Sequence, residues 1–340
     1  MPPSGPSWWY DPGQSAMPWL LHPLAALYGA LGERRLRQTT PYRSTLPVIC
    51  VGNLTAGGAG KTPVACEIAR LLIAEGRRPA FLSRGFGGRT KGPHRVDPAR
   101  DTAAEVGDEP LLLARFAPTF IAAKRDAGAR SIEQSQLADV IVMDDGFQNP
   151  QLAKDLSIIV LDGAKLIGNG RVIPSGPLRL PLEIQLARAD AFVLLHSTEQ
   201  HSQVAKPGFL TGIGKPVLTA AIVPEAGQAE TLTGPLIAYA GIGRPAKFFE
   251  TLRGLRLNPV EAISFPDHHP YSAGDAERLV TRANRSGARL ITTEKDFVRL
   301  AGVPHLAELA SRSTALTIGI HFKDGDERLM KGLLQTARKS

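Results

Sequence analysis

The residues whose types and spacing best suit chemistry form the short stretch TAGGAGKT at 55–62. The stretch fits the phosphate-binding pattern G-x-x-x-x-G-K-[ST], except that Thr55 stands where the pattern has its first glycine. The glycines let the backbone turn several N–H groups toward an anion. Lys61 would reach the outer phosphates of a nucleotide, and the Thr62 hydroxyl would coordinate Mg²⁺. The predicted nucleotide-binding residues are Thr55, Ala56, Gly57, Gly58, Ala59, Gly60, Lys61 and Thr62.

The segment around this loop supplies the strand and the helix that the pattern requires. Apolar residues at 46–52 predict a strand before the glycines, and residues 62–76 have the spacing of an amphipathic helix. The positive end of that helix dipole would strengthen the attraction for phosphate. A glycine-rich turn with a chance Lys-Thr pair is the alternative, but the strand and helix favour a nucleotide. The sequence therefore predicts a site for ATP or GTP.

A second candidate site lies where the predicted strand at 138–143 ends in Asp144-Asp145-Gly146. Phosphate-loop enzymes hold Mg²⁺ with an acid at the end of such a strand. One carboxylate of the pair would face the metal, and the other would tune it or assist proton transfer. An ordinary Asp-Gly turn is the alternative. The alternation of predicted strands and helices around the pair favours the metal site.

Other candidate residues lie where predicted strands and helices begin or end. Arg84 follows a short strand, at the sheet edge where open α/β proteins bind ligands. Arg171 and Arg179 lie in the loop GNGRVIPSGPLRLP, and two arginines there suit an anionic substrate. His268 lies in the polar cluster FPDHHPY, where a histidine beside an acid can serve as a base, and Asp108 precedes a predicted helix. From these residues alone, solvation, a structural turn and helix capping are open alternatives.

Two patterns in the C-terminal part of the sequence resemble nucleotide-binding motifs but are better explained as a turn and a helix cap. GIGRPA at 241–246 fits the dinucleotide pattern G-x-G-x-x-[GA], but any strand-to-helix turn favours glycine, and we reject a nicotinamide site there. TEKD at 293–296 fits a helix capping box. Its spacing does not match a guanine-reading Asn-Lys-x-Asp segment. ATP is therefore the predicted nucleotide.

The length of 340 residues is sufficient for two domains, since most domains hold about 100 to 200 residues. We predict an α/β fold in which residues 41–206 form a P-loop NTPase-like, mostly parallel sheet flanked by helices. A smaller α/β domain would follow at 207–340, and residues 1–40 would form an N-terminal amphipathic membrane helix. Cys50 and Cys66 fall in a predicted strand and a predicted helix, so we expect buried thiols and no disulfide.

The net charge of +8 and the isoelectric point near 9.6 predict an anionic partner. A phosphorylated substrate, nucleic acid and an acidic membrane surface would each satisfy that charge. No nucleic-acid-binding motif accompanies the basic residues, so nucleic acid is not expected. The sequence gives no sign of an obligate protein partner.

The N-terminal segment is apolar from Met17 to Gly32 and is followed by Arg34, Arg35 and Arg37. As a helix it would be about 24 Å long, short of the roughly 30 Å hydrocarbon core of a bilayer. We therefore predict a helix that lies in the membrane interface, with its arginines on anionic lipid. A helix packed on the protein's own core is the alternative. A secretory signal is disfavoured because no positive region precedes the apolar run.

Seven motifs occur in order between Val51 and Leu300: GNLTAGGAGKTP, SRGFGG, GDEP, DDGFQ, GNGRVIPSGPLR, FPDHHPY and TTEKDFVRL. Together they resemble the tetraacyldisaccharide 4′-kinase family, the lipid A 4′-kinases of Gram-negative bacteria. The resemblance implies phosphorylation, dependent on ATP and Mg²⁺, of the 4′-hydroxyl of a tetraacylated glucosamine disaccharide 1-phosphate. It also implies a location at the cytoplasmic face of the inner membrane.

The resemblance also implies roles for particular residues. The family's catalytic acid in G-D-E-P falls on Asp108 and its F-P-D-H histidine on His268, and the two would act as a dyad that takes the proton of the attacking hydroxyl. Its strand-end acids fall on Asp144 and Asp145, with Gln148 nearby at the Mg²⁺ site. The predicted catalytic residues are Asp108, His268, Asp145 and Lys61. The predicted metal ligands are Thr62, Asp144 and Gln148, and the predicted substrate-binding residues are Arg84, Arg171 and Glu109.

Three positions depart from the family pattern. Asn149 follows DGFQ where His is usual, Phe86 replaces Tyr, and Leu180 stands where an acid is common. None removes a group that this chemistry needs, although Leu180 argues against a metal role for its loop. The main rival is a membrane-associated P-loop ATPase of the partition type, a nucleotide-gated adaptor, but the lysine that defines that class is Ala56 here. A basic nucleic-acid ATPase would require salt-sensitive binding to DNA or RNA.

Overall fold

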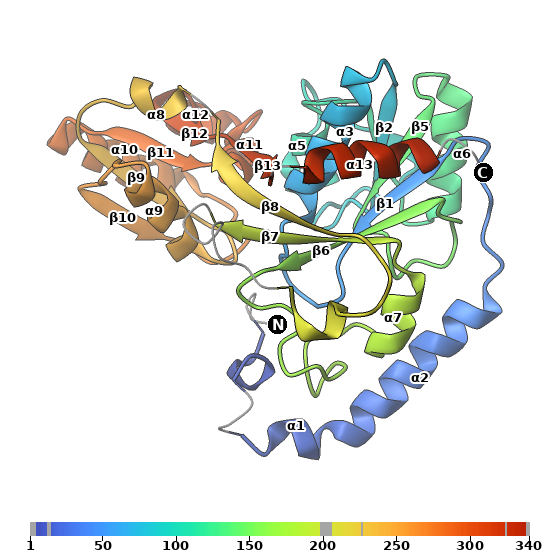
Figure 1. Ribbon diagram of the computed structural model, residues 1–340. Coiled ribbons are helices and arrows are strands. Elements are labelled where there is room, and N and C mark those ends of the chain that lie inside the picture. Colours follow the sequence, from blue (N-terminus) through green and yellow to red (C-terminus); the bar gives the residue numbers. More distant parts are fainter. Residues whose placement is uncertain (1–4, 12–14, 198–205, 226, 324, 338–340) are drawn as a thin grey trace.

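The computed structural model describes residues 5–11, 15–197, 206–225, 227–323 and 325–337. Its strands form two sheets, one of nine strands and one of four. Figure 1 shows the smaller sheet and its helices beside one end of the larger sheet. The two N-terminal helices extend away from both sheets along the lower edge of that view.

The larger sheet is built from β1 (Val48–Gly52), β2 (Pro79–Ser83), β3 (His94–Arg95), β4 (Thr119–Ile121), β5 (Val140–Asp144), β6 (Leu156–Asp162), β7 (Ala191–Ser197), β8 (Val217–Pro224) and β13 (Ile318–Phe322). They lie in the order β13-β8-β7-β6-β1-β5-β2-β4-β3. Neighbouring strands are parallel except for β13–β8 and β3–β4. The inner strands are apolar runs buried on both faces, as a parallel sheet between helix layers requires.

Helices cover both faces of the larger sheet. The helical segments in this part of the fold are η1 (Ser7–Trp9), α1 (Met17–Leu20), α2 (His22–Gln38), α3 (Lys61–Ala74), α4 (Ala103–Val106), α5 (Asp108–Leu113), α6 (Arg125–Ser135), α7 (Leu182–Arg188), η3 (Gly208–Leu210) and α13 (Asp326–Thr336). On one face, α3 and α13 pack Val64, Ile68 and Met330 into the core. On the other face, α6 packs Ala129 and Ile132.

The two cysteines are free thiols on neighbouring elements of the core. Cys50 is buried in β1, as the sequence predicts. Cys66, on α3, was expected to be buried but is partly exposed. The reason is that it borders a cavity beside the phosphate loop.

The smaller sheet is parallel throughout and has the order β10-β9-β11-β12. Its strands are β9 (Leu236–Ala240), β10 (Glu261–Ser264), β11 (Arg289–Thr293) and β12 (Ser313–Leu316). Its helices are α8 (Gln228–Thr231), α9 (Pro245–Gly254), α10 (Ala273–Ser286), α11 (Glu294–Leu300), η4 (Pro304–Leu306) and α12 (Ala307–Arg312). Separate apolar clusters on its two faces give this unit a core of its own.

The two sheets do not separate at residue 207, where the sequence analysis divides the chain. Strand β8 lies beyond that point but pairs with β7 in the larger sheet, and β13 returns to pair with β8. The smaller sheet is therefore inserted between two adjacent strands of the larger one. An apolar strand pattern does not specify the sheet that the strand joins, so the sequence could not place these two strands. We propose that the smaller domain comprises residues 225–317.

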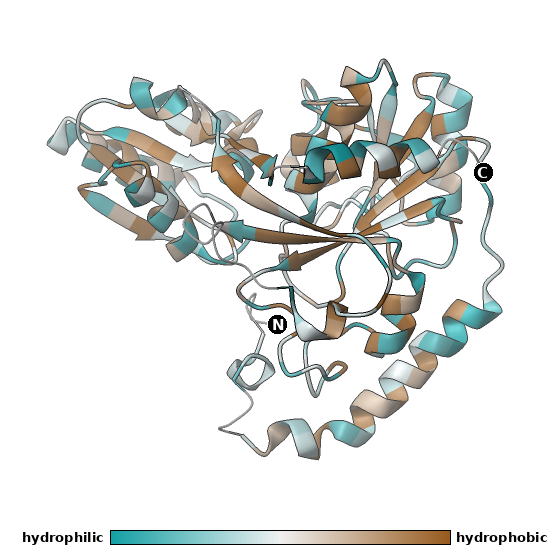
Figure 2. Ribbon diagram, in the orientation of Figure 1, coloured by the Kyte–Doolittle hydropathy of each residue, from teal (hydrophilic) through white to brown (hydrophobic). Residues whose placement is uncertain are grey.

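The N-terminal helices leave a row of large apolar side chains exposed. Exposed fractions range from 46% to 70% for Trp19, Leu20, Leu24, Leu27, Tyr28 and Leu31. On α2, only Ala25 and Gly29 are buried, and Gly29 faces Pro181. Figure 2 shows brown and teal residues alternating along this pair of helices. Among the described helices, none combines the length and the hydropathy needed to cross a bilayer.

Candidate active site

The glycine-rich loop connects the end of β1 to the start of α3, as the sequence predicts. Gly57 and Gly60 have φ angles of 102° and 82°, a conformation that favours glycine because it has no Cβ. Gly60 is the residue before α3, so the loop leads directly into the helix N-terminus. Residues 55–62 all line one cavity. Such an arrangement would direct backbone N–H groups and the positive helix end at an anion in this cavity.

The loop at 168–181 packs on the phosphate loop through Arg179. Its Nε donates a hydrogen bond to the Thr55 carbonyl at 3.1 Å, and its Nη1 donates to Asp145 at 3.1 Å. Arg179 therefore ties the glycine loop to the strand-end acid. From the sequence, Arg179 and Arg171 both suit an anionic substrate, but in the structure Arg179 contacts the phosphate loop and Asp145.

Thr62 and Asp144 meet at the end of β5. The Thr62 hydroxyl donates to Asp144 Oδ2 at 3.0 Å, whereas the buried Asp144 Oδ1 has no hydrogen-bond partner among the described residues. Burial, followed by the charge of Glu109, raises the pKa of Asp144 to about 7. An orphaned carboxylate oxygen beside a hydroxyl suits a hard divalent cation, so these residues fit Mg²⁺.

The remaining ligands of such a cation would come from elsewhere. Among the described residues, there is no cluster of three or more His, Cys, Asp or Glu side chains that could hold a metal by itself. Mg²⁺ usually keeps several waters and binds through one or two carboxylates together with substrate phosphates. The pair Thr62 and Asp144 is therefore suited to a metal that arrives with a nucleotide.

Asp145 pairs with the lysine of the phosphate loop. Lys61 Nζ lies 3.7 Å from Asp145 Oδ2, and Asp145 has a φ of 52° just after the strand. Burial alone would raise the pKa of Asp145, but the charges of Lys61 and Arg179 outweigh it and lower that pKa. Asp145 is thus an ionised anchor that holds Lys61 beside the glycine loop.

Gln148 lies in a different network from the other two predicted metal ligands. Its Nε2 donates to the Asn53 carbonyl at 2.7 Å and to Gln185 Oε1 at 3.1 Å. Its Oε1 accepts a hydrogen bond from Arg179 at 3.2 Å. The structure therefore groups Gln148 with the support of the phosphate loop, and its role as a metal ligand stays a prediction.

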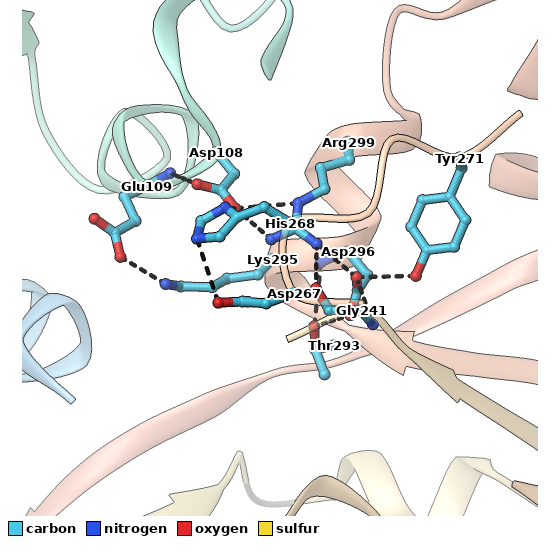
Figure 3. A network of polar contacts seen from close by, with 10 residues as sticks. All are labelled: Asp108, Glu109, Gly241, Asp267, His268, Tyr271, Thr293, Lys295, Asp296 and Arg299. Carbon is cyan, nitrogen blue, oxygen red and sulfur yellow. Dashed lines mark hydrogen bonds and ion pairs between the residues drawn. The ribbon is translucent and has the colours of Figure 1, made fainter. Parts of the chain in front are cut away.

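Asp108 lies on a helix beside the larger sheet, and His268 lies in a loop of the smaller sheet. The two side chains meet where these parts of the fold are in contact (Figure 3). Asp108 is the first residue of α5, and its side chain is only 4% exposed. His268 lies in the loop after β10, where it has a φ of 55° and its N–H donates to the Gly241 carbonyl at 3.0 Å. His268 Nδ1 is 3.2 Å from Asp108 Oδ2. The structure thus brings together the two residues of the predicted dyad.

This contact shifts the pKa of both partners. The hydrogen bond to Asp108 raises the pKa of His268, against the opposing effect of burial. Burial would raise the pKa of Asp108, but the hydrogen bond from His268 and the charges of Lys295 and Arg299 outweigh it, so that pKa is lowered. Asp108 is therefore a carboxylate near neutral pH, and it stabilises an imidazolium on His268.

Two more ion pairs join the sheets beside the dyad. Lys295 Nζ lies 2.6 Å from Glu109 Oε1, and Arg115 Nη1 lies 2.8 Å from Glu294 Oε1. Helix α11 supplies Glu294, Lys295 and also Arg299, which binds Asp108. The sequence analysis missed these residues because it treated the segment as a helix cap. The available signal was the spacing of Lys295 and Arg299, four residues apart and so on one helix face.

The three predicted substrate-binding residues lie in three different places. Glu109 borders the cavity and is held by Lys295. Arg84 is exposed just after β2, the strand that pairs with β5. Arg171 lies over the Trp19 ring, with its guanidinium carbon 3.9 Å from the ring centre. The structure therefore places Glu109 at the cavity and Arg171 against the N-terminal helices.

A cavity of about 320 Å³ lies between the two sheets. Its volume falls in the range typical of small-molecule sites. One wall is the phosphate loop with Cys66 and Glu109, and the opposite wall comes from α9 and the start of α11. Cationic side chains on its walls include Lys61, Lys165, Arg244, Lys247 and Lys295. The cavity is therefore open to an anionic ligand and is bounded by both sheets.

A glycine loop between a strand and a helix, with a Thr hydroxyl on a strand-end Asp, defines a P-loop enzyme of the kind that binds nucleoside triphosphates. Residues 17–338 match the family model described as tetraacyldisaccharide-1-P 4′-kinase. The chain belongs to this family of kinases, as the motif resemblance implies.

Relatives with that name match most of the chain. A tetraacyldisaccharide 4′-kinase of Parvibaculum lavamentivorans is 50% identical, covering 88% of this chain and 87% of the relative. One from Rhodopseudomonas palustris strain BisA53 is 47% identical, covering 96% and 95%. Among solved structures, an "apo" form of LpxK from Aquifex aeolicus in complex with ATP matches with a TM-score of 0.76 and 27% identity, covering 94% of this chain and 99% of that one.

Proposed function

We propose that the chain transfers the γ-phosphate of ATP to the 4′-hydroxyl of a tetraacyl disaccharide 1-phosphate, in lipid A synthesis. The observation that carries this proposal is the position of the Asp108–His268 pair, whose neighbour Glu109 borders the cavity of the phosphate loop. A phosphate loop alone supports nucleotide binding, whereas a base beside it supports transfer to a hydroxyl. The ATP complex of the Aquifex relative supports ATP as the donor.

The phosphates of ATP would lie on the loop amides, with Lys61 on the outer phosphates and Thr62 and Asp144 holding Mg²⁺. When bound, Mg²⁺ neutralises charge on the β- and γ-phosphate oxygens. Asp145, which the sequence analysis predicts to be catalytic, would act by positioning Lys61, since its carboxylate lies 3.7 Å from that lysine. Arg84, Arg171 and Glu109 remain our candidates for contacts to the substrates.

The proton of the acceptor hydroxyl would pass to His268. Its Nδ1 faces Asp108, and Nε2, which lies 3.9 Å from Asp267 Oδ2, would be the nitrogen that takes the proton. Asp108 would fix the ring in the tautomer that carries the proton on Nδ1, and would stabilise the imidazolium that forms. Asp108 itself is held at Oδ1 by the N–H of Glu109, at 2.9 Å. The pair therefore supplies a base, and the phosphate loop supplies charge stabilisation for the transferred group.

Phosphorus NMR of the lipid product tests this function. Incubation with ATP, Mg²⁺ and tetraacyl disaccharide 1-phosphate in mixed micelles should give a second phosphomonoester signal, coupled to the proton at position 4′. A pyrophosphate at position 1, or an acceptor recovered unchanged, would contradict the proposal.

We further propose that α1 and α2 bind the cytoplasmic surface of the bacterial inner membrane. The support is the row of exposed apolar side chains on these helices, followed by the cluster Arg34, Arg35 and Arg37. An apolar face that enters the headgroup region, next to arginines that meet anionic lipid, is the pattern of an interfacial helix. An enzyme held there could act on an acceptor whose acyl chains stay in the bilayer.

Replacing Leu24 and Leu27 with glutamate should reduce binding to anionic vesicles by about a hundredfold or more, because each exposed leucine stabilises the bound state by about 2 kcal/mol when buried in lipid. Flotation of the full chain with vesicles measures this. Val260→Glu is the matched control, since Val260 is 62% exposed but lies in the smaller domain. Equal flotation of the double variant and the wild type would exclude this helix as the anchor.

A further inference from the structure

Arg299 binds the catalytic carboxylate across the interface between the two sheets. It projects from α11, and its side chain is 8% exposed. Its Nε and Nη2 both donate to Asp108 Oδ2, at 3.1 Å and 2.5 Å. This is the oxygen that also faces His268 Nδ1. The guanidinium and the imidazole therefore share one carboxylate oxygen in a site with little access to water.

The other side of the guanidinium is anchored in the smaller sheet. Arg299 Nη1 donates to the Gly241 carbonyl at 2.7 Å and to Asp296 Oδ1 at 2.8 Å. The same Gly241 carbonyl accepts the N–H of His268 at 3.0 Å. Asp296 is fully buried and also accepts hydrogen bonds from the Gly241 N–H and the Tyr271 hydroxyl. Arg299 and His268 are thus fixed to a common backbone point, as Figure 3 shows.

We propose that Arg299 is a positioning residue for phosphoryl transfer, which aligns the Asp108 carboxylate of one domain with the His268 imidazole of the other. The inference rests on the proposed function. It follows from the geometry because α5 and the loop that carries His268 belong to different domains. Arg299 contacts the Asp108 carboxylate with two donors and also binds the Gly241 carbonyl that holds His268. These contacts set the separation of the carboxylate and the imidazole.

The charge of Arg299 acts on the same pair. The ionisable groups that face Asp108 are His268, Lys295 and Arg299, and those that face His268 are Asp108, Asp267 and Arg299. The hydrogen bond to Asp108 raises the pKa of His268, whereas the nearby guanidinium lowers it. Removal of the guanidinium should therefore raise the pKa of His268. Neutral imidazole, the form that can accept the proton, would then prevail only at higher pH.

Arg299→Gln tests this role. We expect kcat to fall by about tenfold to a hundredfold, because misplacement of a catalytic group has effects of that order, while the KM for ATP is unchanged. The acid limb of the profile of kcat against pH should move to higher pH. Arg299→Lys retains a cation, so it should keep the acid limb at the wild-type pH while kcat is still reduced. If the glutamine variant does not fold, the kcat and pH profile of the lysine variant still test the proposed role.

Two comparisons separate positioning from general support of the interface. Arg115→Gln removes another ion pair to α11 without touching the dyad, and it should leave kcat and the pH profile unchanged. When Asp108 is already replaced by Asn, Arg299→Gln should lower kcat by less than about a further twofold, since the effects of residues that act as a unit are not additive. An equal loss in both backgrounds, or an unmoved acid limb in Arg299→Gln, would overturn the inference. If the wild type transfers no phosphate to lipid, the proposed function itself has failed.

Discussion

Asp108→Ala should lower kcat for phosphoryl transfer by about a hundredfold or more, the usual scale of acid–base assistance. The carboxylate orients His268 from 3.2 Å and stabilises its protonated form, so both effects vanish together. The KM for ATP should stay near its wild-type value, because the polar partners of the Asp108 side chain are Glu109, His268 and Arg299, and none of them belongs to the glycine loop. Steady-state kinetics with lipid acceptor in mixed micelles provide the measurement.

The matched control for Asp108 is Asp126→Ala. Asp126 also lies in the first turn of a helix, where an acid favours the helix dipole. It has no part in the dyad, so kcat should be unaffected. His268→Ala should match Asp108→Ala, and the double variant should be no worse than either single one. If kcat of Asp108→Ala stayed within about threefold of the wild-type value, Asp108 would have no role in acid–base catalysis.

Lys61→Ala should abolish most of the activity, with kcat/KM for ATP reduced by about a thousandfold, because a charge that stabilises the transferred phosphate is lost. Lys61 Nζ lies 3.7 Å from Asp145 Oδ2. Asp145 keeps Arg179 as a second partner, so the fold should persist, and the thermal midpoint should change little. ATP binding by calorimetry and transfer kinetics would both report the loss.

Lys91→Ala serves as the control for Lys61, since Lys91 is an exposed lysine that does not line the cavity. It removes the same charge from the chain but none from the cavity, and kcat/KM should be unchanged. Retention of wild-type kcat/KM in Lys61→Ala would show that the glycine loop does not bind the transferred phosphate.

The parts of the site that the sequence predicts are the local ones. The phosphate loop is encoded in consecutive residues, and Asp144 is marked by the end of an apolar strand. The cap of α11 is also local, and it is confirmed by the bond from the Asp296 N–H to Thr293 Oγ1 at 3.1 Å. Each of these signals lies within a few residues, so the pattern and the contact coincide.

The contacts between the two domains could not be derived from residue patterns. Asp108 and His268 are far apart in the sequence, and only the resemblance to a family joined them. Arg299 had no such motif, because a buried contact to a distant carboxylate leaves no periodic trace in its own helix. Likewise, the apolar run at 315–320 reads as one strand, but the structure divides it between β12 in the smaller sheet and β13 in the larger one, because strand pairing depends on partners elsewhere in the chain.

The most direct test of the central claim is the fate of labelled γ-phosphate. The full chain, ATP, Mg²⁺ and tetraacyl disaccharide 1-phosphate would be combined in mixed micelles, and label would be counted in the lipid and aqueous phases against ADP formed. The account predicts one labelled phosphate in the lipid for each ADP, and almost none as inorganic phosphate. Formation of ADP with all of the γ-label recovered as inorganic phosphate would contradict the account. The chain would then be an ATPase that does not use this acceptor.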